Sequence, residues 1–175
     1  TAFPHTGAKK GGGPHTHRRA RPLGEGGAYV PPPMNNLAFA LAVEKLLGCE
    51  IPLRGQYIRV IMAELARLGS HLIWYGTSGI DIGATTPFLY AWREREKILD
   101  VNELVSGVRM MTSYIRVGGL MADVPDQFHD MVAQIVKTFP GFIDDYELLL
   151  TRNPIWVQRL QGVGVISADD AISYG

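Results

Sequence analysis

The chain has 175 residues, of which 46% are hydrophobic, enough for one domain with a sizeable core. Its formal net charge is zero at neutral pH, so composition gives no reason to expect a nucleic-acid partner. No apolar run is long enough to span a membrane, and the start lacks the layout of a signal peptide. Cys49 is the only cysteine, which excludes an intrachain disulfide and a cysteine-bound nickel or iron–sulfur site. We therefore expect a soluble or peripheral protein of a reducing compartment that binds no metal itself.

Residues 1–33 differ in composition from the rest of the chain. Gly, Pro, His and basic residues dominate this stretch, so it buries too little apolar surface to offset the entropy of ordering it. We predict a poorly ordered basic arm, followed by a helical core over residues 34–175. His15 and His17 have no Cys or acidic residue at ligand spacing, so they do not predict a zinc site.

The first predicted helix begins at about Met34 and ends at Gly48. Asn35 or Asn36 could cap its start. Its apolar stripe consists of Leu37, Ala38, Leu41, Ala42 and Leu46. A turn from Pro52 to Gly55 should lead to the next helix.

Residues 56–100 predict two helices joined by a corner rich in Gly, Thr and Pro, over residues 76–87. In the first helix, apolar residues recur at steps of three and four and predict a core face. They are Ile61, Met62, Leu65, Leu68, Leu72 and Ile73. Glu64, Arg67 and His71 lie on the opposite side, as a solvated face does.

The corner has two interpretations, a tight turn between helices and the wall of a ligand pocket. Asp81 stands between two isoleucines in the corner, so we expect its carboxylate to be partly desolvated. In the second helix, Glu94 and Arg95 fall among apolar residues, which predicts that both have partners.

The C-terminal part continues the helical pattern. Residues 114–119 predict a short strand or an extended link, and Asp123 should cap the next helix. A buried face is predicted for Phe128, Met131, Val132, Ile135, Val136 and Phe139. Pro140 should kink or restart this helix, which continues to Leu150. Residues 162–166 predict a strand or turn, and Ser167 should cap a last helix. The fold class is therefore mainly α with minor β, a helix bundle.

Several strings closely resemble the quinone-site (D) subunits of respiratory complex I, the NADH:quinone oxidoreductase. The strings are LAVEKLLG at 41–48, IRVIMAELARLGSHL at 58–72, DIGATTPFLYAWREREKILD at 81–100, GVRMM at 107–111, YIRVGG at 114–119, LLTRNPIW at 149–156 and GVGVISADDAISYG at 162–175. The fold of that family is related to the large subunit of nickel–iron hydrogenases. Family members are longer at both ends, so the resemblance implies an internal piece.

The resemblance implies a subunit that binds no metal and, with an iron–sulfur partner, forms a cavity for quinone reduction. The partner is the B subunit of the complex, whose [4Fe–4S] cluster delivers electrons to ubiquinone or menaquinone. Other peripheral-arm subunits and membrane-arm subunits at the quinone channel are further implied partners. The complex binds NAD, transports electrons and translocates protons, and the subunit that this chain resembles lies peripherally on the cytoplasmic side of the bacterial inner membrane.

Three residues match quinone-site positions of the family. Tyr29 stands where the family has a tyrosine that hydrogen-bonds the quinone headgroup. Asp81 matches an aspartate that pairs with a proton-donating histidine, which lies in a His-Pro-Ala-Ala-His motif upstream of Thr1. Thr77 matches a headgroup-pocket position. The implied catalytic residues are Tyr29 and Asp81.

The match is weakest over residues 8–28. Gly26 stands where the family has an arginine, and Ala28 where it has an aspartate. A stretch read in a shifted frame and true divergence both explain this difference. Met111 also departs from the family, since many relatives have a histidine there, near the partner's cluster.

Two other classes compete with the quinone-site interpretation. A hydrogenase large subunit needs two paired-cysteine motifs, and this sequence has only Cys49. A purely structural subunit of a related membrane complex would keep the fold without a quinone.

Overall fold

The computed structural model describes residue 30 and residues 32–175, and the predicted basic arm lies almost wholly outside these residues. The helices are α3 (Pro32–Leu47), α4 (Leu53–Asp81), α5 (Thr86–Ser106), α6 (Gln127–Tyr146), the π-helical turn η1 (Glu147–Thr151), α7 (Pro154–Leu160) and α8 (Ala168–Tyr174). Strands β1 (Ile115–Arg116) and β2 (Gly119–Leu120) pair in antiparallel fashion. The prediction of a mainly α fold with minor β is confirmed.

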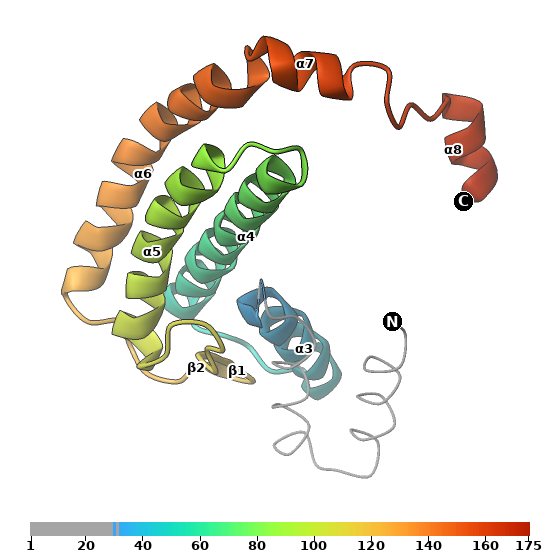
Figure 1. Ribbon diagram of the computed structural model, residues 1–175. Coiled ribbons are helices and arrows are strands. Elements are labelled where there is room, and N and C mark those ends of the chain that lie inside the picture. The colour runs from blue at the N-terminus through green and yellow to red at the C-terminus, as the bar shows by residue number, and fades with distance from the viewer. Residues whose placement is uncertain (1–29, 31) are drawn as a thin grey trace.

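Helices α4 and α5 form an antiparallel hairpin, and α6 lies along the other side of α5 (Figure 1). The core comes from these three helices and from Tyr114, which precedes β1. Its buried members are Ile58, Met62, Leu65, Leu72, Ala91, Ile98, Val101, Val105, Tyr114, Phe128, Ile135 and Tyr146. The predicted core face of α4 is confirmed, and so is its charged face, because Glu64, Arg67 and His71 are exposed.

The corner between α4 and α5 is shorter than predicted, because α4 continues to Asp81 and α5 begins at Thr86. Gly76 remains helical and is buried against α5. A Cβ atom at Gly76 would lie only 3.2 Å from the Cα of Phe88 and 3.4 Å from the Cβ of Ala91. The glycine therefore permits close helix packing and does not break the helix.

Helix α3 packs through a face other than the one predicted. Asn36, Ala40 and Glu44 are buried, whereas Leu41 and Leu46 of the predicted stripe are 52% and 86% exposed. The polar residues point inward because they have partners there: Asn36 donates to the carbonyl of Thr112 at 3.0 Å. Asn36 is therefore no helix cap.

The ends of α3 and α4 also refine the prediction. Helix α3 begins at Pro32, two residues early, as the first turn of a helix tolerates proline. Gly48 ends it as predicted, with φ +63° and a bond from the Cys49 amide to the Glu44 carbonyl. Helix α4 begins at Leu53, so residues 52–55 form no separate turn.

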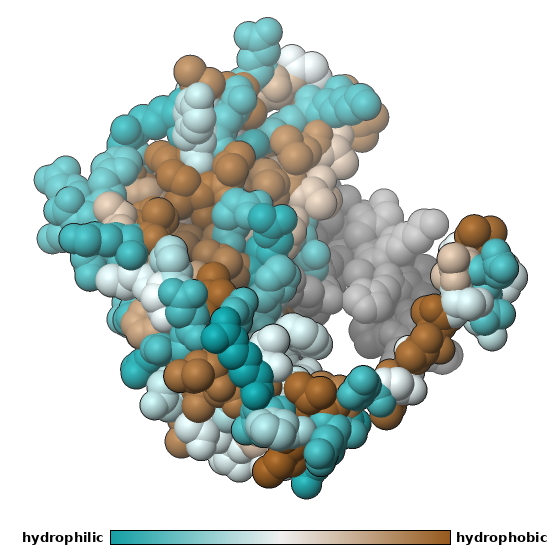
Figure 2. All heavy atoms as spheres, turned by 90° about the horizontal axis from the view of Figure 1, so that it is seen from above, coloured by the Kyte–Doolittle hydropathy of each residue, from teal (hydrophilic) through white to brown (hydrophobic). Residues whose placement is uncertain are grey.

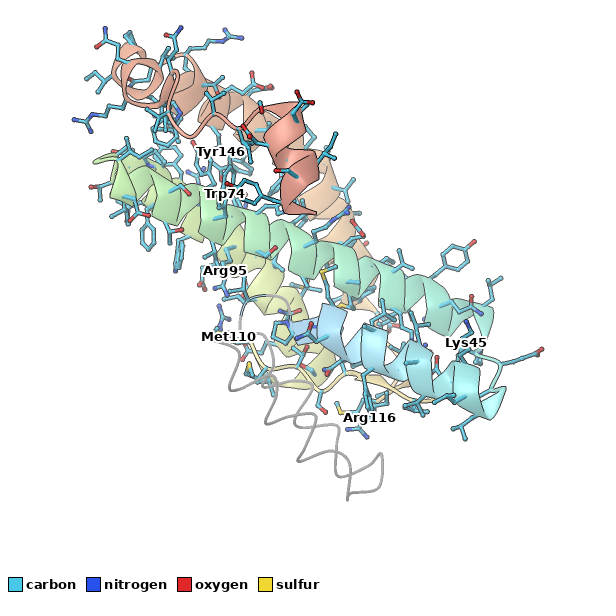
Figure 3. All side chains as sticks on the ribbon, turned by 90° about the vertical axis from the view of Figure 1, so that its right-hand side faces the viewer. Lys45, Trp74, Arg95, Met110, Arg116 and Tyr146 are labelled. Carbon is cyan, nitrogen blue, oxygen red and sulfur yellow. The ribbon has the colours of Figure 1, made fainter. Side chains whose placement is uncertain are left out.

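Two charged residues on α5 are buried, and they differ in their partners. Glu94 accepts hydrogen bonds from Arg93 at 2.9 Å and Lys97 at 2.7 Å, which confirms the prediction for this residue. Arg95 instead lies over the ring of Trp92, 5.7 Å from its centroid. Burial lowers the pKa of Arg95, and Figure 3 shows its place on the same side of the molecule as Met110.

The β1–β2 hairpin confirms the prediction for residues 114–119, with Arg116 opposite Gly119. The predicted cap at Asp123 is wrong, because α6 begins four residues later, at Gln127. Asp123 instead accepts hydrogen bonds from the Val124 amide at 2.8 Å and from Arg54 at 3.0 Å. The Asp123 carboxylate, which was predicted to cap α6, is thus bound by Arg54, 69 residues away in the sequence.

Helix α6 shows most of the predicted buried face, but Val136 is 67% exposed. The helix continues through Pro140 to Tyr146, so it does not restart there. Helix α7 was not predicted, although Asn153 caps it and Pro154 follows directly. Ser167 caps α8 as predicted, accepting from the Asp170 amide at 3.1 Å.

Residues 161–175, the C-terminal arm, extend away from the helical core (Figure 2). Every residue of the arm is exposed, and residues 162–166 form no strand. Its exposed apolar side chains are Val163, Val165, Ile166, Ile172 and Tyr174.

Candidate functional site at the α4–α5 corner

Two glycines shape the corner between α4 and α5. The Ala84 amide donates to the Gly79 carbonyl at 2.7 Å, and a Cβ atom at Gly79 would lie 3.0 Å from the Ala84 carbonyl oxygen. Gly83 has φ +93°, a backbone conformation that favours glycine. The corner is thereby folded tightly back onto the end of α4.

Helix α7 holds the corner from outside. The Arg159 guanidinium donates to the carbonyl of Ile82. A cavity of about 240 Å³ lies between the corner and α7. It is lined by Ile82, Gly83, Ala84, Leu150, Asn153, Ile155, Trp156 and Arg159. The corner is thus both a tight turn and the wall of a cavity, the two interpretations left open by the sequence.

Thr77 and Asp81 lie one turn apart on the exposed side of α4, just before this corner. The Thr77 hydroxyl donates to the Ile73 carbonyl at 2.8 Å, which fixes its oxygen on the helix surface. Neither residue lines the cavity behind the corner. The structure therefore brings these two predicted site residues together on an open surface.

The expectation that Asp81 is desolvated is wrong. Its side chain is exposed, and the adjacent Ile80 is itself 43% exposed and does not cover it. Asp81 ends α4, where the helix dipole disfavours a negative charge, and the last turn contains no basic residue. Asp81 also makes no hydrogen bond with another residue in the described part of the chain, so its carboxylate contributes nothing evident to the fold.

Tyr29, the third predicted site residue, lies outside the described residues. The pairing of Tyr29 with Thr77 and Asp81 therefore stays a prediction.

Sequence reasoning missed a buried ionic cluster beneath the β1–β2 hairpin. Glu44 accepts two hydrogen bonds from Arg59 and one from the Gly118 amide, the last at 2.8 Å. The bonds from Arg59 hold the pKa of Glu44 below its usual value, against the opposing effect of burial. The only sign of this cluster in the sequence is the spacing of Asn36, Ala40 and Glu44. They recur every four residues and so place two polar side chains and one alanine on the same face of α3.

An apolar groove separates α4 from α6 beside the candidate site. Its volume is about 520 Å³, and its lining residues are Leu68, His71, Leu72, Trp74, Tyr75, Phe139, Ile143 and Tyr146. The rings of Tyr75 and Tyr146 are 4.7 Å apart, and the Tyr75 hydroxyl donates to the Tyr146 carbonyl at 3.3 Å. Burial raises the pKa of Tyr75 to about 12, so the phenol is neutral at physiological pH.

Membrane-spanning segments and metal sites are both missing from the part of the chain that the structure describes. Within it, no helix is both long enough and apolar enough to cross a bilayer. No group of three or more His, Cys, Asp or Glu side chains among the same residues is arranged to hold a metal ion.

Residues 81–175 match the family model described as "Respiratory-chain NADH dehydrogenase, 49 Kd subunit". The chain belongs to this family. The matched region begins at Asp81 and includes the corner, α5, α6 and the C-terminal arm.

Curated relatives match nearly the whole chain. The D subunit of the NADH-quinone oxidoreductase of Citrifermentans bemidjiense is 55% identical over 171 residues, which are 98% of this chain and 44% of the relative. The corresponding D subunits of Geotalea uraniireducens and Geobacter sulfurreducens are each 54% identical, with the same coverage of both chains. This member of the 49 Kd family thus spans less than half the length of the relatives it matches.

Proposed function

We propose that this chain is the part of a D subunit of NADH-quinone oxidoreductase that supplies one wall of the quinone-reduction site. Thr77 and Asp81 form that wall on α4, with Tyr29 as the third headgroup residue. The observation that carries the proposal is the position of Asp81: it is exposed, one turn from Thr77, and unfavourable for the helix that bears it. A charge that costs local stability fits a functional role better than a structural one.

Reduction of a quinone to a quinol consumes two electrons and two protons. In the proposed reaction, an iron–sulfur partner would hold a [4Fe–4S] cluster that supplies the electrons one at a time, and residues of this chain would position the quinone and the proton donors. One proton comes from the phenol of Tyr29, and the other from a histidine that Asp81 holds in its protonated form. A carboxylate beside an imidazole favours the imidazolium, which is a suitable general acid near neutral pH.

Thr77 contributes orientation in this proposal. Its hydroxyl hydrogen is engaged with the Ile73 carbonyl at 2.8 Å, so its oxygen is free to accept a hydrogen bond. A quinol hydroxyl is a donor, whereas a quinone carbonyl is only an acceptor. The Thr77 oxygen can therefore accept a hydrogen bond from a quinol hydroxyl. To donate to the carbonyl of an oxidised quinone, the Thr77 hydroxyl must turn its hydrogen away from Ile73.

The partners follow from the same proposal. An iron–sulfur subunit packs against the exposed face of α4 that bears Thr77 and Asp81, so that its cluster lies within electron-transfer range of the headgroup. The remaining peripheral-arm subunits complete the arm outside the membrane, and membrane-arm subunits admit ubiquinone or menaquinone from the bilayer. The subunit itself is peripheral, on the cytoplasmic side of the bacterial inner membrane, and holds no metal.

The test is Asp81→Asn in the assembled complex. It removes one charge at nearly constant shape, and the stability of the subunit should be unchanged or slightly higher because the charge opposes the α4 dipole. Quinone reduction should slow by roughly ten- to a thousandfold, the range for losing a general-acid contribution, while reduction of the partner's cluster by NADH continues. Quinone reductase activity and cluster reduction are measured on the same membranes.

Glu64→Gln is the matched control, because Glu64 is an exposed carboxylate on the same helix and forms an ion pair with Arg67. It should leave both rates unchanged. A purely structural subunit predicts that Asp81→Asn either is silent or lowers assembly and activity in parallel. Either result would refute the proposed site.

A further inference from the structure

Arg95 on α5 is a buried cation that lacks a carboxylate partner among the residues that the structure describes. It is only 7% exposed, and its guanidinium donates no hydrogen bond to any of these residues. Its nearest aromatic neighbour is the ring of Trp92, whose centroid is 5.7 Å away. A guanidinium has five N–H donors, and a buried charge without a hydrogen-bonding partner is strongly unfavourable. The partner of Arg95 therefore lies outside the described residues.

The acidic residues of α5 are already paired with other cations. Glu94 accepts hydrogen bonds from Arg93 and Lys97. Arg109 forms ion pairs with the other three acidic residues of the helix, which are Glu96, Asp100 and Glu103. None of these carboxylates is left for Arg95, although all belong to its own helix.

Arg95 lines a small hollow between α5, α4 and the beginning of α3. Val30, Pro32, Asn102 and Met110 are among its other lining residues, and none of the described residues that line it is acidic. Figure 3 shows Arg95 on the same side of the molecule as Met110. The hollow has a volume of about 20 Å³, which is room for a group about the size of one water molecule. One carboxylate oxygen fits this space, whereas a whole phosphate ion does not.

Glu25 is the acidic residue of this chain that is placed to reach the hollow. It is the only Asp or Glu before Glu44. Val30 lines the hollow and follows Glu25 by five residues, a length of chain that spans at most about 18 Å when extended. We propose that the Glu25 carboxylate pairs with the Arg95 guanidinium at the mouth of the hollow. The pair anchors to α5 the end of the basic arm, which composition alone predicts to be poorly ordered.

This pair would fix the chain on both sides of Tyr29. Glu25 precedes Tyr29 by four residues, and α3 begins three residues after it, at Pro32. Prolines at positions 31–33 further restrict the backbone between Tyr29 and the helix. Glu25 and Arg95 are therefore positioning residues for Tyr29. This consequence rests on the proposed function, in which Tyr29 binds the quinone headgroup, whereas the ion pair itself does not depend on it.

Hydrogen exchange in the full-length protein within its complex tests the pair. The reporters are the amides of residues 28–30, the last amides before the three prolines. Glu25→Gln should speed their exchange by roughly ten- to a hundredfold, the effect of losing a charge-assisted hydrogen bond on local opening. Arg95→Met should give a rise of the same size. The double variant should exchange no faster than either single variant, because both substitutions break one interaction. Glu25→Asp keeps the charge and should retain most of the protection.

Glu50→Gln and Arg93→Met are the matched controls. Glu50 is an exposed carboxylate just after α3, and Arg93 is a nearby arginine that pairs with Glu94. Neither change should alter the exchange of residues 28–30. Unchanged exchange in Glu25→Gln, or effects of the two substitutions that multiply in the double variant, would overturn the inference. A rise with Arg95→Met alone would assign the partner of Arg95 to another subunit and would overturn it too. None of these measurements involves quinone turnover, so the Asp81→Asn test of the proposed function stands or falls separately.

Discussion

Arg59 on α4 and Glu44 on α3 form a buried bidentate ion pair, with bonds of 2.9 and 2.6 Å between guanidinium and carboxylate. The same guanidinium donates to the carbonyl of Arg116 at 2.6 Å and to that of Gly119 at 2.9 Å. One side chain therefore joins two helices and both strands of the hairpin. Because nearly every N–H group of the Arg59 guanidinium donates a hydrogen bond, the ion pair has the partners that a buried pair needs.

We predict that Arg59→Met strongly destabilises the protein. The substitution keeps most of the apolar volume but leaves the Glu44 carboxylate buried without its main partner, which costs about 3–5 kcal/mol of unfolding free energy. Urea unfolding followed by circular dichroism measures the change. Arg67→Met is the control, because the Arg67–Glu64 pair is exposed and screened by water. Equal losses in the two variants would contradict the assigned role of the buried pair.

The second prediction concerns the pH dependence of the same pair. The pKa of Glu44 is lower in the folded protein than its ordinary value of 4.5, so the unfolded state binds more protons in acid. The stabilising contribution of Glu44 is therefore fully present above about pH 4.5 and is lost as pH falls through the lower folded-state pKa. Glu44→Gln should be less stable than the parent at pH 7, and this difference should shrink below pH 4.5. A difference that stays constant from about pH 7 to about pH 3 would contradict the prediction.

The sequence predicted long helices well where their core faces are apolar. In α4, residues such as Met62 and Leu72 recur with the helical period and are buried, because burying apolar surface dominates packing there. Helix α3 was predicted at the right place in the sequence, but the wrong face was predicted to be buried. Its inward residues Asn36 and Glu44 are stabilised by Thr112, Arg59 and Gly118, and such distant partners leave no periodic signal.

For the candidate site, too, the sequence predicted one part correctly and another part wrongly. The family resemblance selected Thr77 and Asp81, and the structure places them one turn apart on one helix. Flanking isoleucines suggested a desolvated Asp81, but exposure depends on which elements lie above a residue, which local sequence does not specify. Helix α7 could have been found from Asn153 followed by Pro154, a cap and first-turn pair that favours helix initiation.

The third prediction tests the close approach of α4 and α5. Gly76→Ala should destabilise the protein by about 1–2 kcal/mol, because its Cβ would lie 3.2 Å from the Phe88 backbone and the helices must separate. Gly141→Ala in α6 is the matched control, since no atom beyond its chain neighbours and the nearby backbone of its own helix lies within 4 Å of the position that its methyl group would take. That change should stabilise by about 0.5–1 kcal/mol through helix propensity. Thermal unfolding of both variants gives the comparison, and a stabilised Gly76→Ala protein would disprove the packing argument.

The last prediction rests on the proposed function and concerns Met111, the position for which the family resemblance implies a histidine in many relatives, near the partner's cluster. Met111 is half-buried between Met110 and the fully buried Thr112. The Thr112 amide donates to the Met110 carbonyl at 2.9 Å, so the backbone around Met111 is fixed and a histidine there would have a defined position.

A thioether cannot take up a proton when a neighbouring cluster gains an electron, whereas an imidazole titrates between about pH 5 and 8. In the assembled complex, the midpoint potential of the partner's [4Fe–4S] cluster should therefore be nearly independent of pH from about 6 to 8, a behaviour that suits a low-potential acceptor such as menaquinone. Met111→His should introduce a slope that approaches about 59 mV per pH unit, the value for one proton per electron. Met110→His is the control, because Met110 is the adjacent residue, is 43% exposed, and is not the position for which the family resemblance implies a histidine. Redox titrations followed by electron paramagnetic resonance measure the three proteins, and a steep slope in the parent protein would show that another group near the cluster takes up the proton.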